Sequence, residues 1–284
     1  MRKIFPNVVE ELMIKDKRIF CLLGDIGVFS FRKIFKKFTN RILNMSTMEQ
    51  TMIGFGAGLS KGGFIPIIHS ITPFLVLRAL EQIKIDFVYN KLSCNIVSVG
   101  GSNDYAKLGT THHCFEDISI LSNYEGINLF LPSSANEFKF LFKKNYKNKK
   151  VNYFRISNNV EGKILKKNCF IKKNKNKNLV IIVGNSIGAD AFFNKKVDLY
   201  YINQISKNIK FNFVKNYKKI IIIEPYFGKI IERKIRQQNF LNSKILSIGY
   251  EETIIHNYGD KKTQDRYLKF DRESIVKKTN AFLK

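Results

Sequence analysis

Short, uninterrupted apolar runs recur along this chain, separated by longer segments of mixed polarity, and this alternation restricts the folds open to it. Apolar runs of this length between helix-like segments are typical of parallel strands buried on both faces. In the first half they are RIFCLLGD (18–25), FIPIIHS (64–70), SCNIVSVGG (93–101), INLFLP (127–132) and NYFRI (152–156). The sequence therefore predicts an α/β fold, a parallel sheet flanked by helices.

A second series of apolar runs follows a polar segment rich in Lys and Asn. Its members are LVIIVGNS (179–186), VDLYYINQ (197–204), KKIIIIEPY (218–226) and SKILSIGY (243–250), with a helix expected over 228–239. At 284 residues the chain has the length of two modest domains. We predict a first domain over 1–157, a linker over 158–178 and a smaller α/β domain over 179–284.

The net charge of +26 raises the possibility of a nucleic-acid or membrane partner. The lysines are spread through nearly every segment, however, without interleaved aromatic residues, so we interpret them as solvated surface and expect neither partner. The four cysteines lie far apart, and no apolar run approaches the roughly 20 residues of a membrane span. The N-terminus lacks the apolar core of a signal peptide, so we expect a soluble, cytoplasmic protein.

A carboxylate, Glu49, opens an otherwise small and apolar helical segment over 48–63. Low-dielectric surroundings raise a carboxyl pKa, so a buried acid here could share a proton with a ligand nitrogen. The alternative is a negative charge that stabilises the N-terminus of the helix, an effect of roughly 0.3–1 kcal/mol. Composition alone favours this second role.

The segment GGSNDYAKLGTTHHCFED (100–117) gathers glycines, hydroxyls, histidines and acids after a predicted strand. Loops at the carboxyl ends of parallel strands are where such folds bind ligands. We predict that one of the adjacent histidines, His112 and His113, faces substrate while its neighbour is structural, and we assign no metal ligands. The turn at Gly24–Gly27 is a weak nucleotide signature, and Arg155 could grip a phosphate or pair with an acid.

The segments RILNMSTMEQTMIGFGAGLSKGGFIPIIHSITPF, RALEQIKIDF, GTTHHCFEDI and LFLPSSANE resemble, in order and spacing, the pyrimidine-binding domain of transketolases. The resemblance covers about residues 22–155, and the rest of the chain resembles the transketolase C-terminal domain less sharply. The nearest variants are split transketolases, in which this half is a separate polypeptide. The fold implied is a transketolase-type pyrimidine-binding domain followed by a smaller C-terminal domain.

The resemblance assigns roles to individual residues. Glu49 matches the glutamate that hydrogen-bonds the aminopyrimidine ring nitrogen of thiamine diphosphate, which reverses the preference for a helix cap. His112 matches the histidine that contacts sugar hydroxyls and is thus implied to be catalytic. Asp25 and Ile26 match residues that support the pyrimidine, and Arg155 falls where transketolases carry a substrate-phosphate arginine.

Departures from the family pattern are also visible. The aromatic pair against the aminopyrimidine reduces to Phe74, with Ile71 in the other position, so Phe55 could supply further stacking. Leu108 stands where many transketolases have an acid that contacts a sugar hydroxyl, which puts ordinary pentose-phosphate specificity in doubt.

The sequence has no GDG motif with a following Asn of the kind that holds the cofactor's diphosphate and a divalent ion. The resemblance therefore implies that Mg²⁺ is held by a diphosphate-binding partner subunit in a heterotetramer, and that this chain alone is inactive. The implied reaction is two-carbon ketol transfer between sugars or sugar phosphates. The alternatives are a deoxyxylulose-phosphate-synthase-like subunit, a 2-oxo-acid dehydrogenase β-type subunit, or a non-catalytic scaffold that binds anions.

Overall fold

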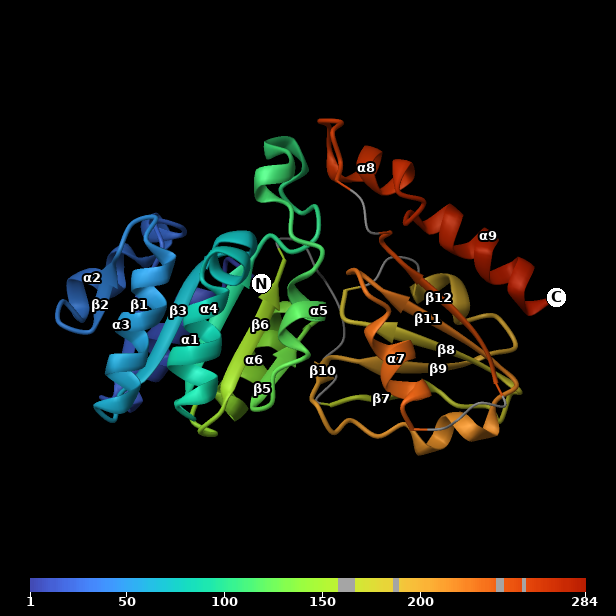
Figure 1. Cartoon of the computed structure of the whole chain (residues 1–284), viewed down its shortest axis with the longest axis horizontal. Helices are drawn as coiled ribbons and strands as arrows, with labels where there is room; N and C mark the ends of the chain where they lie inside the picture. The colour runs from blue at the N-terminus through green and yellow to red at the C-terminus, as the bar shows by residue number, and fades with distance from the viewer. Residues whose placement is uncertain (158–166, 186–188, 239–242, 252–253) are drawn as a thin grey trace.

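The structure, a computed structural model, describes residues 1–157, 167–185, 189–238, 243–251 and 254–284. These residues form two helix-covered sheets that lie side by side, with the first half of the chain building most of one and the second half building the other (Figure 1).

Seven strands form the first sheet in the described part of the chain. The six strands that come from the first half of the chain run parallel to one another. In spatial order the seven strands are β10 (Gln204–Ile205), β5 (Ile127–Phe130), β6 (Val151–Ile156), β4 (Cys94–Val99), β3 (Ile65–Ile71), β1 (Ile19–Leu23) and β2 (Ile42–Asn44). Strand β10 comes from the second half and pairs with β5 in the antiparallel direction.

Helices cover both faces of this sheet and bury separate apolar clusters. One face carries α3 (Glu49–Lys61), the helical turns η2 (Phe74–Arg78), α4 (Leu80–Gln82) and η3 (Ile83–Tyr89), and α5 (Asp117–Leu121). The other face carries α1 (Phe5–Lys15), α2 (Arg32–Lys37) and α6 (Ala135–Asn145). Short 3₁₀ turns lie at η1 (Val28–Phe31), η4 (Ala106–Leu108) and η5 (Thr110–His112).

The second sheet has five strands among the described residues, in the order β12 (Lys244–Gly249), β11 (Lys219–Glu224), β8 (Asn178–Val183), β9 (Asp198–Ile202) and β7 (Cys169–Lys172). All pair in parallel except β7, which is antiparallel to β9. The accompanying helices and turns are η6 (Ala189–Phe192), η7 (Asn212–Asn216), α7 (Ile230–Arg236), α8 (Lys261–Tyr267) and α9 (Arg272–Leu283). Helices α8 and α9 begin at Asp260 and Asp271, whose side chains accept backbone N–H bonds and so cap the first turn.

The predicted fold class is confirmed, and each predicted apolar run contains a strand. The sequence did not predict β2, β7 or β10. Strand β7 lies inside the segment predicted as a linker, so that range is not wholly a connection; its residues 158–166 are outside the described residues. The surrounding sequence of β7 is polar and does not predict a strand, and β7 forms because it pairs with β9 in the antiparallel direction.

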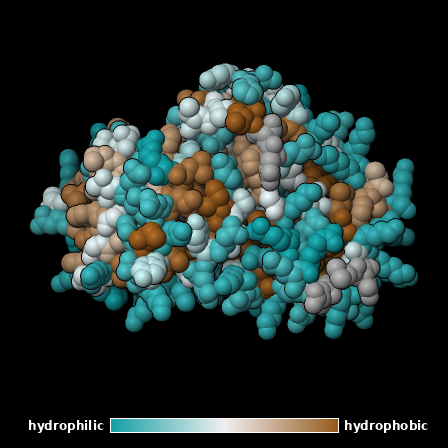
Figure 2. All heavy atoms as spheres, in the orientation of Figure 1, coloured by the Kyte–Doolittle hydropathy of each residue, from teal (hydrophilic) through white to brown (hydrophobic). Residues whose placement is uncertain are grey.

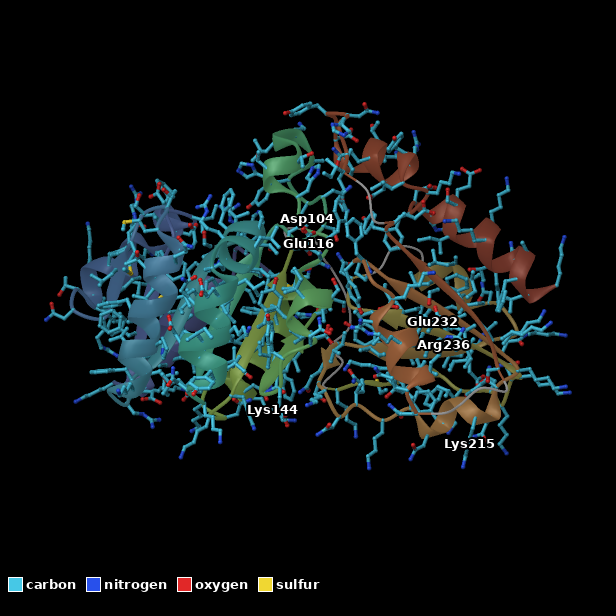
Figure 3. All side chains as sticks on the ribbon, in the orientation of Figure 1. Asp104, Glu116, Lys144, Lys215, Glu232 and Arg236 are labelled. Atoms are coloured by element: carbon cyan, nitrogen blue, oxygen red, sulfur yellow. The ribbon has the colours of Figure 1, made fainter. Side chains whose placement is uncertain are left out.

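One apolar cluster runs through both halves. It joins side chains on the α3 face of the first sheet, such as Ile68 and Ile96, to side chains of the second sheet, such as Ile181 and Ile222. The lysines, in contrast, extend outward from separate parts of the molecule, as Lys144 and Lys215 do in Figure 3. Within the described residues no helix is both long and apolar enough to cross a membrane.

The carboxyl end of β11 holds a buried acid, Glu224, whose Oε2 accepts the backbone N–H of Ile231 at 3.1 Å. Burial raises the pKa of Glu224 to about 7 from 4.5. Because the folded protein holds this proton more tightly than the unfolded chain, the carboxyl's contribution to stability is complete below pH 4.5 and is lost as the pH rises through 7.

We therefore expect Glu224→Gln to gain stability relative to the unmodified protein as the pH rises from 4.5 to 8, by about 3 kcal/mol in the free energy of unfolding. Urea unfolding at several pH values measures this difference. Glu232→Gln is the control, because Glu232 pairs with Arg236 on the surface of α7 (Figure 3) and should show no such gain. A difference that stays constant with pH would contradict the assignment.

Candidate functional site at the carboxyl edge of the first sheet

Glu49 is the first residue of α3 and is fully buried at the carboxyl edge of the first sheet. It lies beside the ends of β1 and β3, where Gly24 follows β1 and Ser70 is the penultimate residue of β3. A Cβ at position 24 would stand 2.8 Å from Ser70 and 3.3 Å from Oε1 of Glu49. Glycine is therefore required for this close approach of chain to carboxylate.

Two side chains donate to the Glu49 carboxylate. Ser70 Oγ donates to Oε1 at 2.8 Å, and the guanidinium of Arg78 donates from Nη1 to Oε2 at 2.7 Å. The predicted burial of Glu49 is thus present, but its surroundings are not purely apolar. A buried carboxylate with one charged and one hydroxyl partner has its hydrogen-bonding needs met without acting as a simple helix cap.

A row of flat side chains leads from Glu49 to the loop that carries His112. The Arg78 guanidinium carbon lies 4.4 Å from the centroid of the Phe74 ring, so the cation rests over the ring. The Phe74 ring in turn meets His112 edge-on with centroids 5.2 Å apart, and Tyr105 lies beyond His112 at 6.2 Å. The structure therefore brings the predicted residues Glu49, Phe74 and His112 to one place.

The two adjacent histidines have different environments. His112 is half-buried, and its Nδ1 lies 2.9 Å from Thr111 Oγ1. His113 is buried against Phe115, and this burial lowers its pKa. Of the two histidines, His112 is therefore the more exposed and His113 the buried one.

The turn after β1 holds Asp25 and Ile26. Asp25 is exposed with φ of +53°, and it exchanges two hydrogen bonds of 3.0 Å with the side chain of Asn44 in β2. Ile26 is half-buried against the cluster beneath α1. The short strand β2 therefore fixes the turn in which the sequence placed two cofactor contacts.

Phe55 is not brought to this site. It lies six residues along α3 from Glu49, about 9 Å along the helix axis. Its ring meets Phe20 at 6.3 Å, near the amino end of the sheet, where Phe20 pairs with Pro66. This location corrects the expectation that Phe55 could stack on the cofactor.

The two residues that depart from the family pattern are placed as follows. Ile71 is the last residue of β3, and Leu108 is half exposed in η4.

Of the two roles that the sequence left open for Arg155, the structure shows the ion pair with an acid. Its Nε lies 3.0 Å from the buried carboxylate of Asp117, Nη1 donates to the carbonyl of Pro225 at 2.9 Å, and Nη2 donates to Ser102 Oγ at 2.7 Å. Asp117 also accepts the hydroxyl of Tyr153 at 2.7 Å. Both terminal nitrogens of Arg155 donate to protein groups, and the side chain is 9% exposed. Arg155 therefore ties the two halves together, which disfavours a phosphate-binding role.

The loop that carries His112 is held by the C-terminal half. Thr110 Oγ1 donates to the carbonyl of Ile255 at 2.6 Å, and Asn103 donates to Asp265 at 3.0 Å. Gly109 has φ of +74° and ψ of −168°, a region open essentially to glycine, and lies against the ring of Tyr258. The position of His112 therefore depends on residues far away in sequence.

We expect Gly109→Ala to misplace His112 and to slow, by about tenfold or more, any reaction in which His112 takes part. An alanine Cβ would lie 2.6 Å from the Tyr258 ring and would carry a backbone strain of about 1–3 kcal/mol. Steady-state kinetics measure the effect, and Gly126→Ala, at φ +86° with open space around it, separates backbone strain in general from strain in this loop. Equal kinetic losses in both variants would refute a specific role for the loop.

Among the described residues, no group of three or more His, Cys, Asp or Glu side chains is arranged to hold a metal ion. Two site residues, Ser70 and Arg78, were missed in the sequence. Arg78 begins the segment RALEQIKIDF, which carries part of the resemblance, and its spacing of four from Phe74 places both on one side of a helical segment, but it was given no role. Nothing in the sequence connects Ser70 to Glu49.

Residues 1–160 match the family described as transketolase, pyrimidine binding domain. The chain belongs to this family. The transketolase-type fold extends beyond the matched residues, because the structure resembles solved transketolases over 99% of its length. One is a split-gene transketolase described as an inactive β4 tetramer, with a TM-score of 0.82 at 18% identity and 97% of that chain covered. Another is the transketolase of Campylobacter jejuni, with a TM-score of 0.80 at 12% identity and 46% covered.

Similar sequences include two apulose-4-phosphate transketolase B subunits. That of Actinobacillus succinogenes is 36% identical over 102 residues, which are 36% of this chain and 33% of that protein. That of Phocaeicola vulgatus is 32% identical over 143 residues, which are 50% of this chain and 46% of that protein. The alignments thus span between a third and a half of the length of these relatives.

Proposed function

We propose that this chain is one subunit of a thiamine-diphosphate-dependent transketolase, and that it supplies the pyrimidine side of the cofactor site. The observation that carries the proposal is the buried carboxylate of Glu49, aligned with the Phe74 ring and with His112 at the carboxyl edge of a parallel sheet. A buried acid beside an aromatic face suits a flat, weakly basic ring that needs both a hydrogen-bond partner and a stacking surface.

Each residue has a distinct task in this proposal. Glu49 holds a proton at the aminopyrimidine ring nitrogen, with Ser70 fixing its orientation through the 2.8 Å hydrogen bond. Phe74 stacks on the ring, and Asp25 and Ile26 support it from the β1 turn. His112 orients the hydroxyls of a sugar or sugar phosphate. Thiamine diphosphate supplies, when bound, the carbon nucleophile needed for two-carbon transfer.

A separate, diphosphate-binding subunit completes the site in this proposal and holds Mg²⁺, in a two-plus-two assembly; this chain is inactive by itself. The B-subunit names of the similar proteins support this arrangement. Apolar side chains on and beside α3 also support it, because Met48, Phe55, Leu77, Ile85 and Tyr89 are exposed. Figure 2 shows apolar atoms gathered over the part of this face where α3 and α4 lie.

Two further points belong to the proposal. Leu108, in place of an acid, favours an acceptor or donor sugar other than the ordinary pentose phosphates. The four cysteines are all free thiols, three of them buried, which suits a reducing cytoplasm.

Calorimetry with thiamine diphosphate and magnesium tests the proposal on this chain alone, on a diphosphate-binding transketolase subunit of the same genome alone, and on their mixture. Binding and ketol transfer only in the mixture are the expected results. If the mixture binds no thiamine diphosphate, the catalytic assignment fails and an anion-binding scaffold becomes the better interpretation. Pyruvate and ketose donors, supplied separately, distinguish a synthase-like reaction from ketol transfer.

A further inference from the structure

Arg78 occupies the space between the two groups that the proposed function gives to the cofactor's ring. Its guanidinium donates to the Glu49 carboxylate at 2.7 Å and lies over the Phe74 ring at 4.4 Å. These are two contacts on one flat group, a hydrogen bond at its edge and an aromatic face against its plane. No other residue described for this chain makes both.

A guanidinium and an aminopyrimidine are chemically alike in this respect. Both are planar, both carry N–H groups in the plane, and both stack on aromatic rings. Under the proposed function the aminopyrimidine needs Glu49 at its edge and Phe74 against its face. The ring and the Arg78 guanidinium therefore require the same carboxylate oxygen and the same aromatic surface.

We propose that Arg78 is an internal occupant of the pyrimidine position, which must withdraw before the cofactor's ring can bind. This inference rests on the proposed function. It adds a residue that lowers the affinity for the cofactor and occupies the pyrimidine position when the cofactor is absent. The buried Glu49 carboxylate then keeps a hydrogen-bond partner at all times, Arg78 in the free protein and the ring in the loaded one.

The surroundings of Arg78 allow it to leave. Its side chain is 43% exposed although its partner is fully buried, and its only hydrogen bond to a described residue is to Glu49. It ends the helical turn η2, and the next residue, Ala79, has non-helical dihedrals of −110° and 23°. A long side chain at such a break can swing to solvent without disturbing the core. Ser70 remains bonded to Glu49 throughout.

Self-occupancy weakens cofactor binding in a calculable way. Apparent affinity falls by the fraction of molecules whose site is open, so a site closed nine-tenths of the time binds about tenfold more weakly than an open one. Removal of the guanidinium should therefore tighten binding of thiamine diphosphate about tenfold. Ligands that do not reach the pyrimidine position should be unaffected.

The test uses the assembled complex of this chain with its diphosphate-binding subunit and the variant Arg78→Met, which keeps a long side chain but removes the cation. Calorimetry measures two probes with magnesium, thiamine diphosphate and inorganic pyrophosphate. Arg236→Met is the matched control, because Arg236 also pairs with a glutamate at 2.7 Å and is 49% exposed, but lies on α7 in the other half. We expect about tenfold tighter thiamine diphosphate binding in Arg78→Met alone, with pyrophosphate binding unchanged in both variants.

Equal or weaker binding of thiamine diphosphate by a folded Arg78→Met complex overturns the inference, since the arginine would then assist the cofactor or have no effect. Circular dichroism establishes folding. If the methionine variant does not fold, Arg78→Lys decides the question, because lysine keeps the charge but cannot lie flat on Phe74 and should still tighten binding several-fold. Failure of the unmodified complex to bind thiamine diphosphate would instead remove the proposed function itself, and the inference with it.

Discussion

Replacement of Glu49 by glutamine should reduce turnover of the assembled enzyme by a factor of about 10² to 10⁴. Glutamine has the size of glutamate, and its amide oxygen can still accept one of the hydrogen bonds that Ser70 and Arg78 donate. It cannot take up or release a proton. The loss should therefore appear in kcat, measured as two-carbon transfer at saturating cofactor, while calorimetry should show that thiamine diphosphate still binds.

Glu232→Gln is the matched control, because Glu232 pairs with Arg236 at the same 2.7 Å that separates Glu49 from Arg78. It removes a carboxylate from an arginine pair on α7 and should leave turnover unchanged. If Glu49→Gln keeps turnover within a few-fold of the unmodified complex, Glu49 does not exchange a proton with the cofactor.

Replacement of Arg155 by methionine should lower the free energy of unfolding by about 3 to 5 kcal/mol. Asp117 has no exposed surface, and burial raises its pKa while the charge of Arg155 opposes that rise. Without the guanidinium, an acid is left uncompensated in the interior. The contact to Ser102 and the contact to Pro225, which crosses between the two halves, are lost as well. Urea unfolding followed by circular dichroism measures the loss.

The double variant Arg155→Met, Asp117→Asn separates the charge from the packing. It removes the stranded acid, so it should recover a substantial part of the stability that the single variant loses. A loss below about 1 kcal/mol in Arg155→Met would mean that the ion pair contributes little. A large effect on sugar-phosphate affinity in a variant of normal stability would restore the phosphate-binding role that the structure disfavours.

Much of the fold could be predicted because most of its strands coincide with apolar runs in the sequence. The runs that became β1, β3, β8 and β11 are continuous and apolar, as strands buried on both faces must be. Strands β2 and β10 could not be found in this way, since they have three and two residues and exist through their neighbours. Pairing across the sheet, not local composition, decides such short elements.

The site was predictable only in part. The resemblance supplied Glu49, Phe74 and His112, and the structure gathers them. Arg78 begins one of the resembling segments, but nothing in the sequence connects it to Glu49, and only the fold brings it to that buried acid. For Arg155 the sequence left a phosphate and an acid as alternative partners, because it could not show that Asp117 and the second half lie against this side chain.

Strand β10 has a consequence for how this protein can be divided. Among the strands that the first half contributes to the first sheet, β5 is outermost on one side. It is covered by β10, whose two residues, Gln204 and Ile205, belong to the later half of the chain. A fragment that stops before β10 would present β5 as a bare edge, with unpaired N–H and C=O groups ready to add a strand from another molecule. Division of the chain between β5 and β10 would therefore uncover a strand edge that the intact protein keeps paired.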